Sequence, residues 1–398
     1  MSLIGQNITI LGAGVAGLAL SRALALRGAK VTVLEQADAI REIGAGLQVS
    51  PNGAVVLKAL GLEAELAARS TRAEAVELRD GPDNRLVTRL EVASLRPDQG
   101  YHFLHRADLV DLLATGARDA GVTLRLLQKI ASVDLTGPRP RWTTEQGDGG
   151  SADLLIGADG IHSRMREALT GKVAPYFTRQ VAWRALIPET PGVPNVAEVH
   201  MGPGRHLVSY PLRGGTLRNI VAVEERNRWV DEGWNIRDDA MEMRLAFSSF
   251  SPRVQDWLAQ VEDVWLWGLF RHPVAKNWHR VLPEGAVALL GDAAHPTLPF
   301  LAQGASMALE DAWVLAEALA SHDTVGAGLA AYEAARKPRC TRIVAAADAN
   351  ARAYHLSGPL RGIAHLGLRL AGQIDPQMPL RRFDWLYGHD VTRPNGTT

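Results

Sequence analysis

This 398-residue sequence has almost no cysteine and no excess of charge of either sign. Cys340 is its only cysteine, which excludes an internal disulfide framework and leaves no cysteine cluster for a structural metal. The 43 basic and 43 acidic residues balance, so no broad positive field indicates nucleic acid or an anionic membrane as a partner. We therefore expect small-molecule partners, no bound metal and a reducing, cytoplasmic location.

Long hydrophobic runs are also missing. The most apolar N-terminal stretch, residues 8–20, is interrupted by glycines and is shorter than a membrane span. No cluster of positive charge precedes it, so it predicts a buried strand and helix rather than a signal or an anchor. With 46% hydrophobic residues, the chain is long enough for two or three domains around a large core.

The first motif follows alternating β-branched residues at 8–10, where Gly12, Gly14 and Gly17 form the pattern GxGxxG. An apolar periodic helix comes next, and a second strand, VTVLE, ends at Glu35. This order is a complete βαβ unit of dinucleotide-binding type. The glycines allow a tight turn, close approach of the backbone to a pyrophosphate and close helix packing, while Glu35 can accept hydrogen bonds from ribose hydroxyls.

The glycine motif alone does not separate FAD from NAD, but later segments do. A glycine-rich loop over residues 41–48 stands where an NAD dehydrogenase would continue directly into further βα units, and its length suits a longer cofactor. Two more apolar strands, LLIGA and VALLG, are followed by Asp159 and Asp292. In α/β folds ligand contacts lie at such strand ends, so three strands ending at one edge predict one extended ligand.

These motifs, with YEAARKPR at 332–339, resemble the single-component FAD-dependent aromatic hydroxylases, the group of para-hydroxybenzoate and salicylate hydroxylases. The resemblance extends from residue 8 to about residue 388. The segment AQGASMALEDA at 302–312 resembles in particular the branch of 3-hydroxybenzoate 6-hydroxylase and 6-hydroxynicotinate 3-monooxygenase. The wider family usually has glycine and often asparagine where this chain has Ala302 and Ser306.

The resemblance implies a bound FAD. Glu35 and the glycine motif would hold its ADP half, Arg41 and Arg106 would reach the pyrophosphate and ribityl region, and Asp292 would hold the ribityl chain. The helix that begins at Gly304 would direct its N-terminal amides at the flavin. The full set of expected cofactor contacts is Gly12, Gly14, Val15, Ala16, Gly17, Glu35, Gln36, Arg41, Gln48, Arg106, Ile130, Asp159, Asp292, Pro299, Gly304, Ala305 and Ser306.

The segment 181–270 reads as five strands, with two shorter ones over 76–92. Such alternating segments suit a mostly antiparallel sheet. The predicted fold is therefore α/β, a Rossmann-like FAD-binding domain with an inserted, mostly antiparallel β-sheet substrate domain and C-terminal helices. The predicted boundaries are 1–72, 95–180 and 273–345 for the FAD domain, 73–94 and 181–272 for the substrate domain, and 346–398 for the C-terminal helices.

Within RHLVSYP, His206 and Tyr210 are four residues apart, so on a strand they point to the same face. A phenol becomes an electron-rich ring when its proton is removed. A histidine can take that proton and a tyrosine can position the hydroxyl. The resemblance supports this pair as catalytic, while a half-buried sheet histidine bonded to backbone is the alternative.

Three further residues are candidate substrate contacts. Phe300 and Leu301 would supply a dry, apolar lining, and Arg184 could pair with a substrate carboxylate, although a strand-surface charge is the reading that we favour for Arg184. The pattern WxW at Trp265 and Trp267 occurs in flavin halogenases, but no Ile-Pro follows it here, so one packed sheet face explains it more simply.

The implied activity is hydroxylation of a phenolic or hydroxypyridine aromatic acid by FAD, O2 and NADH or NADPH, through a C4a-hydroperoxyflavin. No second glycine motif follows for the nicotinamide nucleotide, so its binding would be transient. The C-terminal helices could support a homodimer. The alternatives are a non-catalytic flavoprotein of the same fold and an NAD-dependent dehydrogenase.

Overall fold

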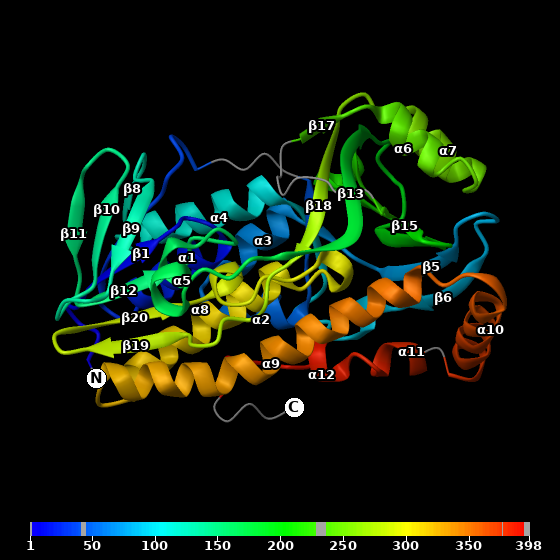
Figure 1. Cartoon of the computed structure of the whole chain (residues 1–398). Coiled ribbons are helices and arrows are strands. Elements are labelled where there is room, and N and C mark those ends of the chain that lie inside the picture. Colours follow the sequence, from blue (N-terminus) through cyan, green and yellow to red (C-terminus); the bar gives the residue numbers. More distant parts are fainter. Residues whose placement is uncertain (1, 41–44, 228–235, 376, 394–398) are drawn as a thin grey trace.

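The computed structural model describes residues 2–40, 45–227, 236–375 and 377–393. It has two large sheets, one towards each end of the molecule, and the long helix α9 (Val325–Tyr354) runs beneath both (Figure 1). The expected fold class, a Rossmann-like domain with an inserted, mostly antiparallel sheet and C-terminal helices, is confirmed.

The first sheet has six strands. Their order is β19 (His279–Leu282), β20 (Gly285–Leu289), β12 (Leu154–Gly157), β1 (Asn7–Leu11), β2 (Lys30–Leu34) and β8 (Thr123–Arg125). Strands β1, β12 and β20 are parallel neighbours, so their C-terminal ends meet at one edge, as the sequence predicts. Helix α1 (Val15–Ala25) follows β1 and packs against α4 (Arg106–Asp119) and α8 (Gly304–Ser321).

The second sheet has eight strands. Their order is β17 (Ile236–Asp238), β18 (Val264–Arg271), β13 (Tyr176–Pro188), β16 (Leu217–Glu225), β15 (Arg205–Leu212), β14 (Val196–Gly202), β5 (Ala75–Asp80) and β6 (Leu86–Leu90). All pairs are antiparallel except β14 with β5. The strands from 76–92 thus join those from 181–270, as expected.

The five strands expected within 181–270 are all present. Two helices, α6 (Ala240–Ala246) and α7 (Pro252–Ala259), lie between the fourth and the fifth of them, where the sequence predicts no strand. Each helix has a start signal. The Asp239 side chain accepts a hydrogen bond from Met241 N at the start of α6, and α7 begins with Pro252 at its first position.

The other strands of the described residues form two small three-stranded sheets. One contains β3 (Gly46–Val49), β7 (His102–His105) and β4 (Thr71–Arg72), and the other contains β11 (Gly149–Ser151), β10 (Arg141–Thr144) and β9 (Ile130–Asp134). The first touches the large antiparallel sheet, because Gly46 N donates to Asn219 Oδ1 at 2.7 Å. The short helices α2 (Pro51–Ala59) and α3 (Glu63–Arg69) lie between β3 and β4, and α5 (Arg164–Thr170) connects β12 to β13.

The C-terminal part consists of α9, α10 (Gly358–Ile374), α11 (Met378–Arg381) and α12 (Asp384–Tyr387). The predicted boundary between residues 345 and 346 falls inside α9, a continuous 30-residue helix. Helix α9 contacts β19 and β20 of the first large sheet, and its Asp348 pairs with Arg271 of β18 in the second. The other domain boundaries remain a prediction.

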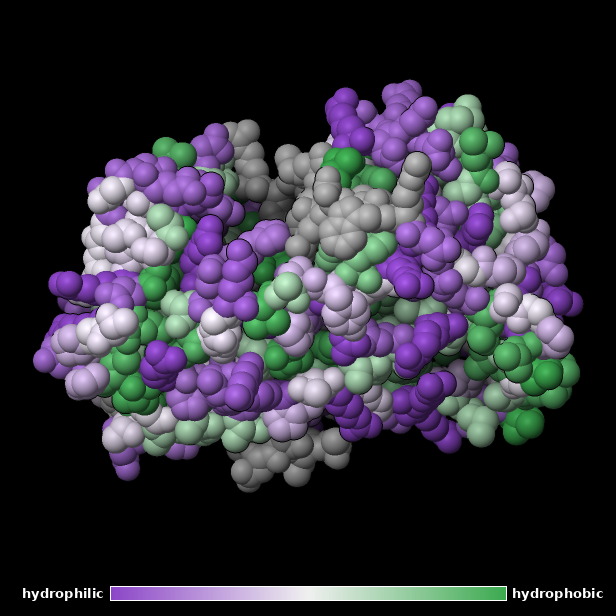
Figure 2. Space-filling view, viewed as in Figure 1, coloured by the Kyte–Doolittle hydropathy of each residue, from purple (hydrophilic) through white to green (hydrophobic). Residues whose placement is uncertain are grey.

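Helix α10 presents apolar side chains to the outside (Figure 2). The exposed residues, each 49–82% accessible, are Leu360, Ile363, Leu366, Leu370 and Ile374. The expected homodimer remains a prediction, and this stripe is a surface on which it can be tested. Among the described residues, no helix combines the length and the apolar character that crossing a membrane requires.

Candidate active site

The three glycines after β1 differ in what surrounds them. A Cβ at Gly12 would lie 2.5 Å from Ala158 O, and one at Gly17 would lie 2.0 Å from Gly12 O, so both positions need glycine for packing. Gly12 also has a φ of +97°. Around a Cβ at Gly14, by contrast, no atom lies within 4 Å, and Gly14 lines a large cavity. Close approach of a phosphate needs such an open backbone.

Glu35 follows β2 beside this glycine loop. Its carboxylate accepts hydrogen bonds from Ala13 N at 2.7 Å and Ala37 N at 2.9 Å, which fix it next to the loop. Ile130 begins β9 nearby, two residues after Gln128, whose amide donates to Glu35 O at 2.7 Å. The structure therefore places Glu35 against the glycine loop and the start of β9 near Glu35, although neither Glu35 nor Ile130 lines the cavity.

Four more of the predicted cofactor contacts and Arg41 differ in where the structure places them. Val15 and Ala16 form the first turn of α1 and line the cavity. Gln48, on β3, lines it as well. Gln36 is exposed to solvent. Arg41 lies outside the described residues.

Asp159 does not line the cavity, although Ala158 and Gly160 beside it do. Its carboxylate accepts hydrogen bonds from the Ser163 hydroxyl and from Met165 N at 3.2 Å, across the turn into α5. Burial raises the pKa of Asp159, and these hydrogen bonds oppose the shift. The predicted ligand contact of this carboxylate is therefore replaced by a structural one, in which it holds the turn that presents Gly160.

Asp292 and Arg106 both line the cavity, from the loop after β20 and from the first position of α4. Burial lowers the pKa of Arg106, and Asp292 opposes that shift. Burial also raises the pKa of Asp292, opposed by His295 and Arg106. Arg106 therefore faces the cavity and is not simply a solvent-exposed charge on the first turn of a helix. Arg106 and Asp292 thus place a positive and a negative charge in the same part of the cavity, near enough to affect each other's pKa.

The loop and first turn of α8 form another part of the wall. Pro299, Gly304 and Ala305 line the cavity as predicted, but Ser306 does not. Ser306 is buried, with its Oγ 3.1 Å from Ser50 Oγ, because it lies on the side of α8 that packs on α2. Ala302 adopts a left-handed φ of +52°, a backbone conformation that glycine adopts with less strain.

His206 and Tyr210 lie on β15 and both line the cavity, which measures about 510 Å3. The prediction that they share a face is confirmed. Burial, followed by the neighbouring His355, lowers the pKa of His206 well below its ordinary value. Burial raises the pKa of Tyr210 strongly. At neutral pH the histidine is therefore a neutral acceptor and the tyrosine a neutral donor.

Arg184 on β13 lines the cavity and is not a strand-surface charge, so the favoured sequence reading is wrong and the substrate-side alternative fits. Its guanidinium stacks on the Trp267 ring at 3.9 Å from the centroid. Burial and then the positive charge of Arg106 lower the pKa of Arg184 to about 9, while Tyr210 opposes the shift. Trp267 is buried on this same face, as expected for packing.

Phe300 and Leu301 are buried and line the cavity beside Leu298, so the predicted apolar lining is present. The Phe300 ring contacts His206 with centroids 5.5 Å apart. Asn350 of α9 fixes this loop by donating to Phe300 O at 3.3 Å. The apolar lining therefore reaches His206.

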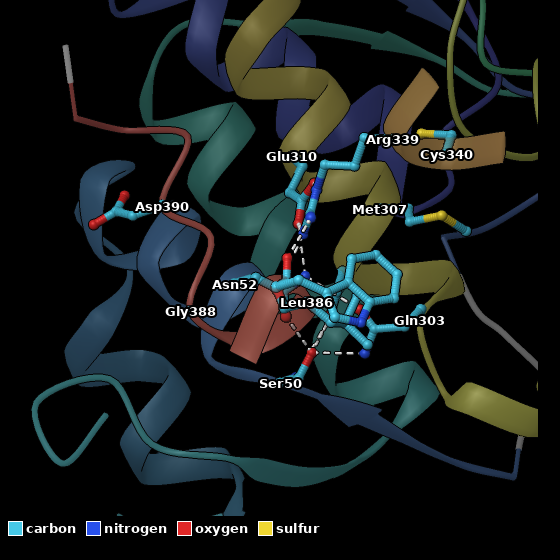
Figure 3. A network of polar contacts seen from close by, with 12 residues as sticks. Ser50, Asn52, Gln303, Met307, Glu310, Arg339, Cys340, Leu386, Gly388 and Asp390 are labelled. Atoms are coloured by element: carbon cyan, nitrogen blue, oxygen red, sulfur yellow. Dashed lines mark hydrogen bonds and ion pairs between the residues drawn. The ribbon is translucent and has the colours of Figure 1, made fainter. Parts of the chain in front are cut away.

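A buried polar network holds the start of α8 in place (Figure 3). Asn52 of α2 donates to Glu310 Oε1 at 2.6 Å, and Arg339 of α9 donates to the same oxygen at 2.8 Å. Gln303, which lines the cavity, donates to Ser50 Oγ at 2.9 Å. The network joins α2, α8 and α9. Glu310, which lies beyond the first turn of α8, holds α2 and α9 to that helix by accepting hydrogen bonds from Asn52 and Arg339.

Two residues, His355 and Glu225, extend from His206 through hydrogen bonds and were not predicted from the sequence. His206 Nδ1 lies 2.7 Å from His355 Nε2, and His355 Nδ1 lies 2.7 Å from Glu225 Oε1. His355 follows His206 by 149 residues, and Glu225 is on the neighbouring strand β16, so no local spacing connects them.

These residues fit the FAD that the motifs imply. The open backbone at Gly14 and the charges of Arg106 and Asp292 border one continuous cavity that reaches His206, and the carboxylate of Glu35 is fixed to Ala13 N in the glycine loop. Gly14 and Glu35 suit the ADP half, and Arg106 and Asp292 suit the ribityl side.

Comparisons with known proteins agree. A family model described as "FAD binding domain" matches residues 6–347. The 3-amino-4-hydroxybenzoate 2-monooxygenase of Streptomyces platensis is 32% identical, and the alignment covers 97% of this chain and 96% of that protein. The 3-hydroxybenzoate 6-hydroxylase of Klebsiella oxytoca is 33% identical, with 95% and 96% covered. The 6-hydroxynicotinate 3-monooxygenase of Bordetella bronchiseptica is 30% identical, with 97% and 95% covered.

A solved salicylate hydroxylase substrate complex has the same fold, with a TM-score of 0.80 at 23% identity over 97% of this chain and 96% of that one. The relatives favour a monooxygenase over the dehydrogenase alternative. The resemblance seen in the motifs is confirmed over nearly the whole length. The chain belongs to the FAD-binding-domain family, among the FAD-dependent aromatic monooxygenases.

Proposed function

We propose that this enzyme hydroxylates a phenolic or hydroxypyridine aromatic acid and consumes O2 and NADH or NADPH. The observation that carries the proposal is that Arg184 and His206 share one cavity wall. Arg184 pairs with Val221, which pairs with Val208 on β15, two residues from His206. Two strand spacings and two residues along a strand separate the Cα atoms of Arg184 and His206 by about 12 Å. An aromatic ring fits between side chains that reach inward from these positions.

Each group has a distinct task in this arrangement. Arg184 binds the substrate carboxylate, with the Trp267 ring supporting the plane of its guanidinium. His206 accepts the proton of the ring hydroxyl, and Tyr210 donates a hydrogen bond to the resulting oxyanion. Removal of this proton makes the ring electron-rich, which prepares it for electrophilic oxygen.

Bound FAD would supply the redox chemistry and the activation of O2. The residues of this chain exclude water and orient the ring. Leu298, Phe300 and Leu301 give the apolar lining, so that peroxide is not lost to solvent. The names of the relatives, which specify hydroxybenzoates and 6-hydroxynicotinate, support an aromatic acid with a ring hydroxyl.

The test is NADH and NADPH oxidation by FAD-loaded protein with 3-hydroxybenzoate, salicylate, 3-amino-4-hydroxybenzoate and 6-hydroxynicotinate. Product identification and a peroxide correction accompany each rate, and benzoate, which has no hydroxyl, is the matched control. We expect at least one hydroxylated product and none from benzoate. If every acid yields only peroxide, or none stimulates oxidation, the proposal is wrong.

A further inference from the structure

A chain of ring nitrogens and a carboxylate leads from the cavity to the surface. His206 is buried and lines the cavity, and its Nδ1 lies 2.7 Å from His355 Nε2. His355 is also buried, and its Nδ1 lies 2.7 Å from Glu225 Oε1. The Glu225 side chain is 53% exposed. Two hydrogen bonds therefore connect a buried base to water.

The acceptor at the outer end determines the tautomer of both rings. A carboxylate only accepts hydrogen bonds, so His355 must donate from Nδ1 to Glu225. A neutral His355 then has a bare Nε2, and His206 must donate to it from Nδ1. The second nitrogen of a neutral His206, Nε2, is consequently bare. Glu225 thereby makes His206 a base toward the cavity.

The groups around His206 agree with a neutral ring. Phe300 and Tyr354 pack against it at centroid distances of 5.5 and 5.2 Å, and burial raises the pKa of Tyr354 to about 12. His355 is the other titratable neighbour in contact. No carboxylate touches His206 directly within the described residues, so the negative charge reaches it only through His355.

The groups around His355 keep it neutral at rest and allow a proton to pass. Burial lowers its pKa, Glu225 opposes that shift, and the positive Arg205 on β15 adds to it. His355 also caps the C-terminal end of α9, where the helix dipole favours a transient positive charge. These opposing influences suit a ring that holds an extra proton only briefly.

We propose that His355 and Glu225 form a proton relay that fixes the tautomer of His206 and conducts the substrate's hydroxyl proton to solvent. The relay rests on the proposed function. The substrate O–H bond breaks as His206 Nε2 gains the proton, and the Nδ1 proton of His206 passes to His355 Nε2. The Nδ1 proton of His355 then passes to Glu225, which releases it to water. Both histidines end neutral with one proton each, so the only charge that the step adds to the cavity is the negative charge on the substrate oxygen.

The experiment follows proton release when 3-hydroxybenzoate binds to FAD-loaded enzyme without NADH or NADPH. Stopped-flow absorbance of a pH indicator in weak buffer gives the release rate, and an equilibrium titration gives the ligand affinity. We expect wild type to release a proton on binding, whereas Glu225→Gln and His355→Gln should release it on the order of tenfold to a hundredfold more slowly. Affinity should change less than twofold.

Glu224→Gln is the matched control, because Glu224 is adjacent on β16 but pairs with Arg205 and Arg226. Its release rate should equal that of wild type. Glu225→Ala, at a half-exposed position, guards against misfolding, and added acetate should restore its rate in proportion to concentration. A merely structural role would show no such rescue.

The relay is overturned if wild type binds the ligand without releasing a proton, or if Glu225→Gln releases it at the rate of Glu224→Gln. Product formation by wild type separates the two proposals. Hydroxylation with unchanged proton release in the variants refutes the relay alone. Absence of any hydroxylated product across the phenolic acids refutes the proposed function, and the relay with it.

Discussion

Gly14→Ala should separate cofactor binding from folding. Gly14 has φ and ψ of −78° and −173°, which alanine adopts freely, and a Cβ there meets no atom within 4 Å. A Gly→Ala change at such a position stabilises by about 0.4–1 kcal/mol through the unfolded chain. Because alanine is a poorer helix N-cap by a similar amount, the two effects nearly cancel. The apoprotein should stay within about 1 kcal/mol of wild type.

The added methyl group nevertheless occupies the open space next to the backbone that a phosphate must approach. We expect FAD affinity to fall at least about tenfold, equivalent to about 1.4 kcal/mol. Gly17→Ala is the contrasting variant, because its Cβ would lie 2.0 Å from the backbone oxygen of Gly12, which cannot move aside as a side chain could. It should lose at least about 1–3 kcal/mol of stability.

The assays are urea unfolding of apoprotein followed by circular dichroism and titration of FAD followed by flavin fluorescence. The reasoning fails if Gly14→Ala binds FAD as tightly as wild type. It fails equally if Gly14→Ala destabilises the apoprotein as much as Gly17→Ala does, since the distinction between an open and a packed glycine would then be false.

Three further outcomes are expected. Arg336→Met leaves the buried carboxylates Glu310 and Asp311 without their shared cation, so urea unfolding should show a loss of about 3–5 kcal/mol. In wild type these carboxylates have pKa values lowered to about 2, chiefly by charge pairing that outweighs burial. Their stabilisation is therefore present above pH 4.5 and is lost as pH falls toward 2, which urea midpoints from pH 6 to 2.5 should show. Because the pKa of Arg184 is lowered to about 9, benzoate affinity should fall as pH rises through 9, and benzamide affinity measured by the same titration should not.

Much of the cofactor site could be predicted because its residues act over short sequence distances. Gly12, Gly14 and Gly17 fall within six residues, and the strand that carries Glu35 follows one helix later. His206 and Tyr210 were found because alternation along one strand places them on one face. In these cases a local period defines the geometry without knowledge of the rest of the fold.

The remaining site residues depend on packing between distant segments. Arg184 was misread because β13 is buried on both faces, so its neighbours Trp183 and Ala185 show no polar side that would identify the surface. Ser306 turns to α2 rather than the cavity, which only the position of α8 decides. His355 meets His206 because α9 ends beside β15, and nothing within either segment encodes that meeting.

The packing of α1 against α8 has a consequence for the folding of the chain during its synthesis on the ribosome. About 280 residues separate the end of α1 from the start of α8. At roughly 5–20 residues per second, a ribosome needs about 15–55 s to synthesise them. During that interval the apolar side of α1 lacks its final cover. A chain that terminates early should therefore be a substrate for chaperones and proteases rather than a partly active enzyme.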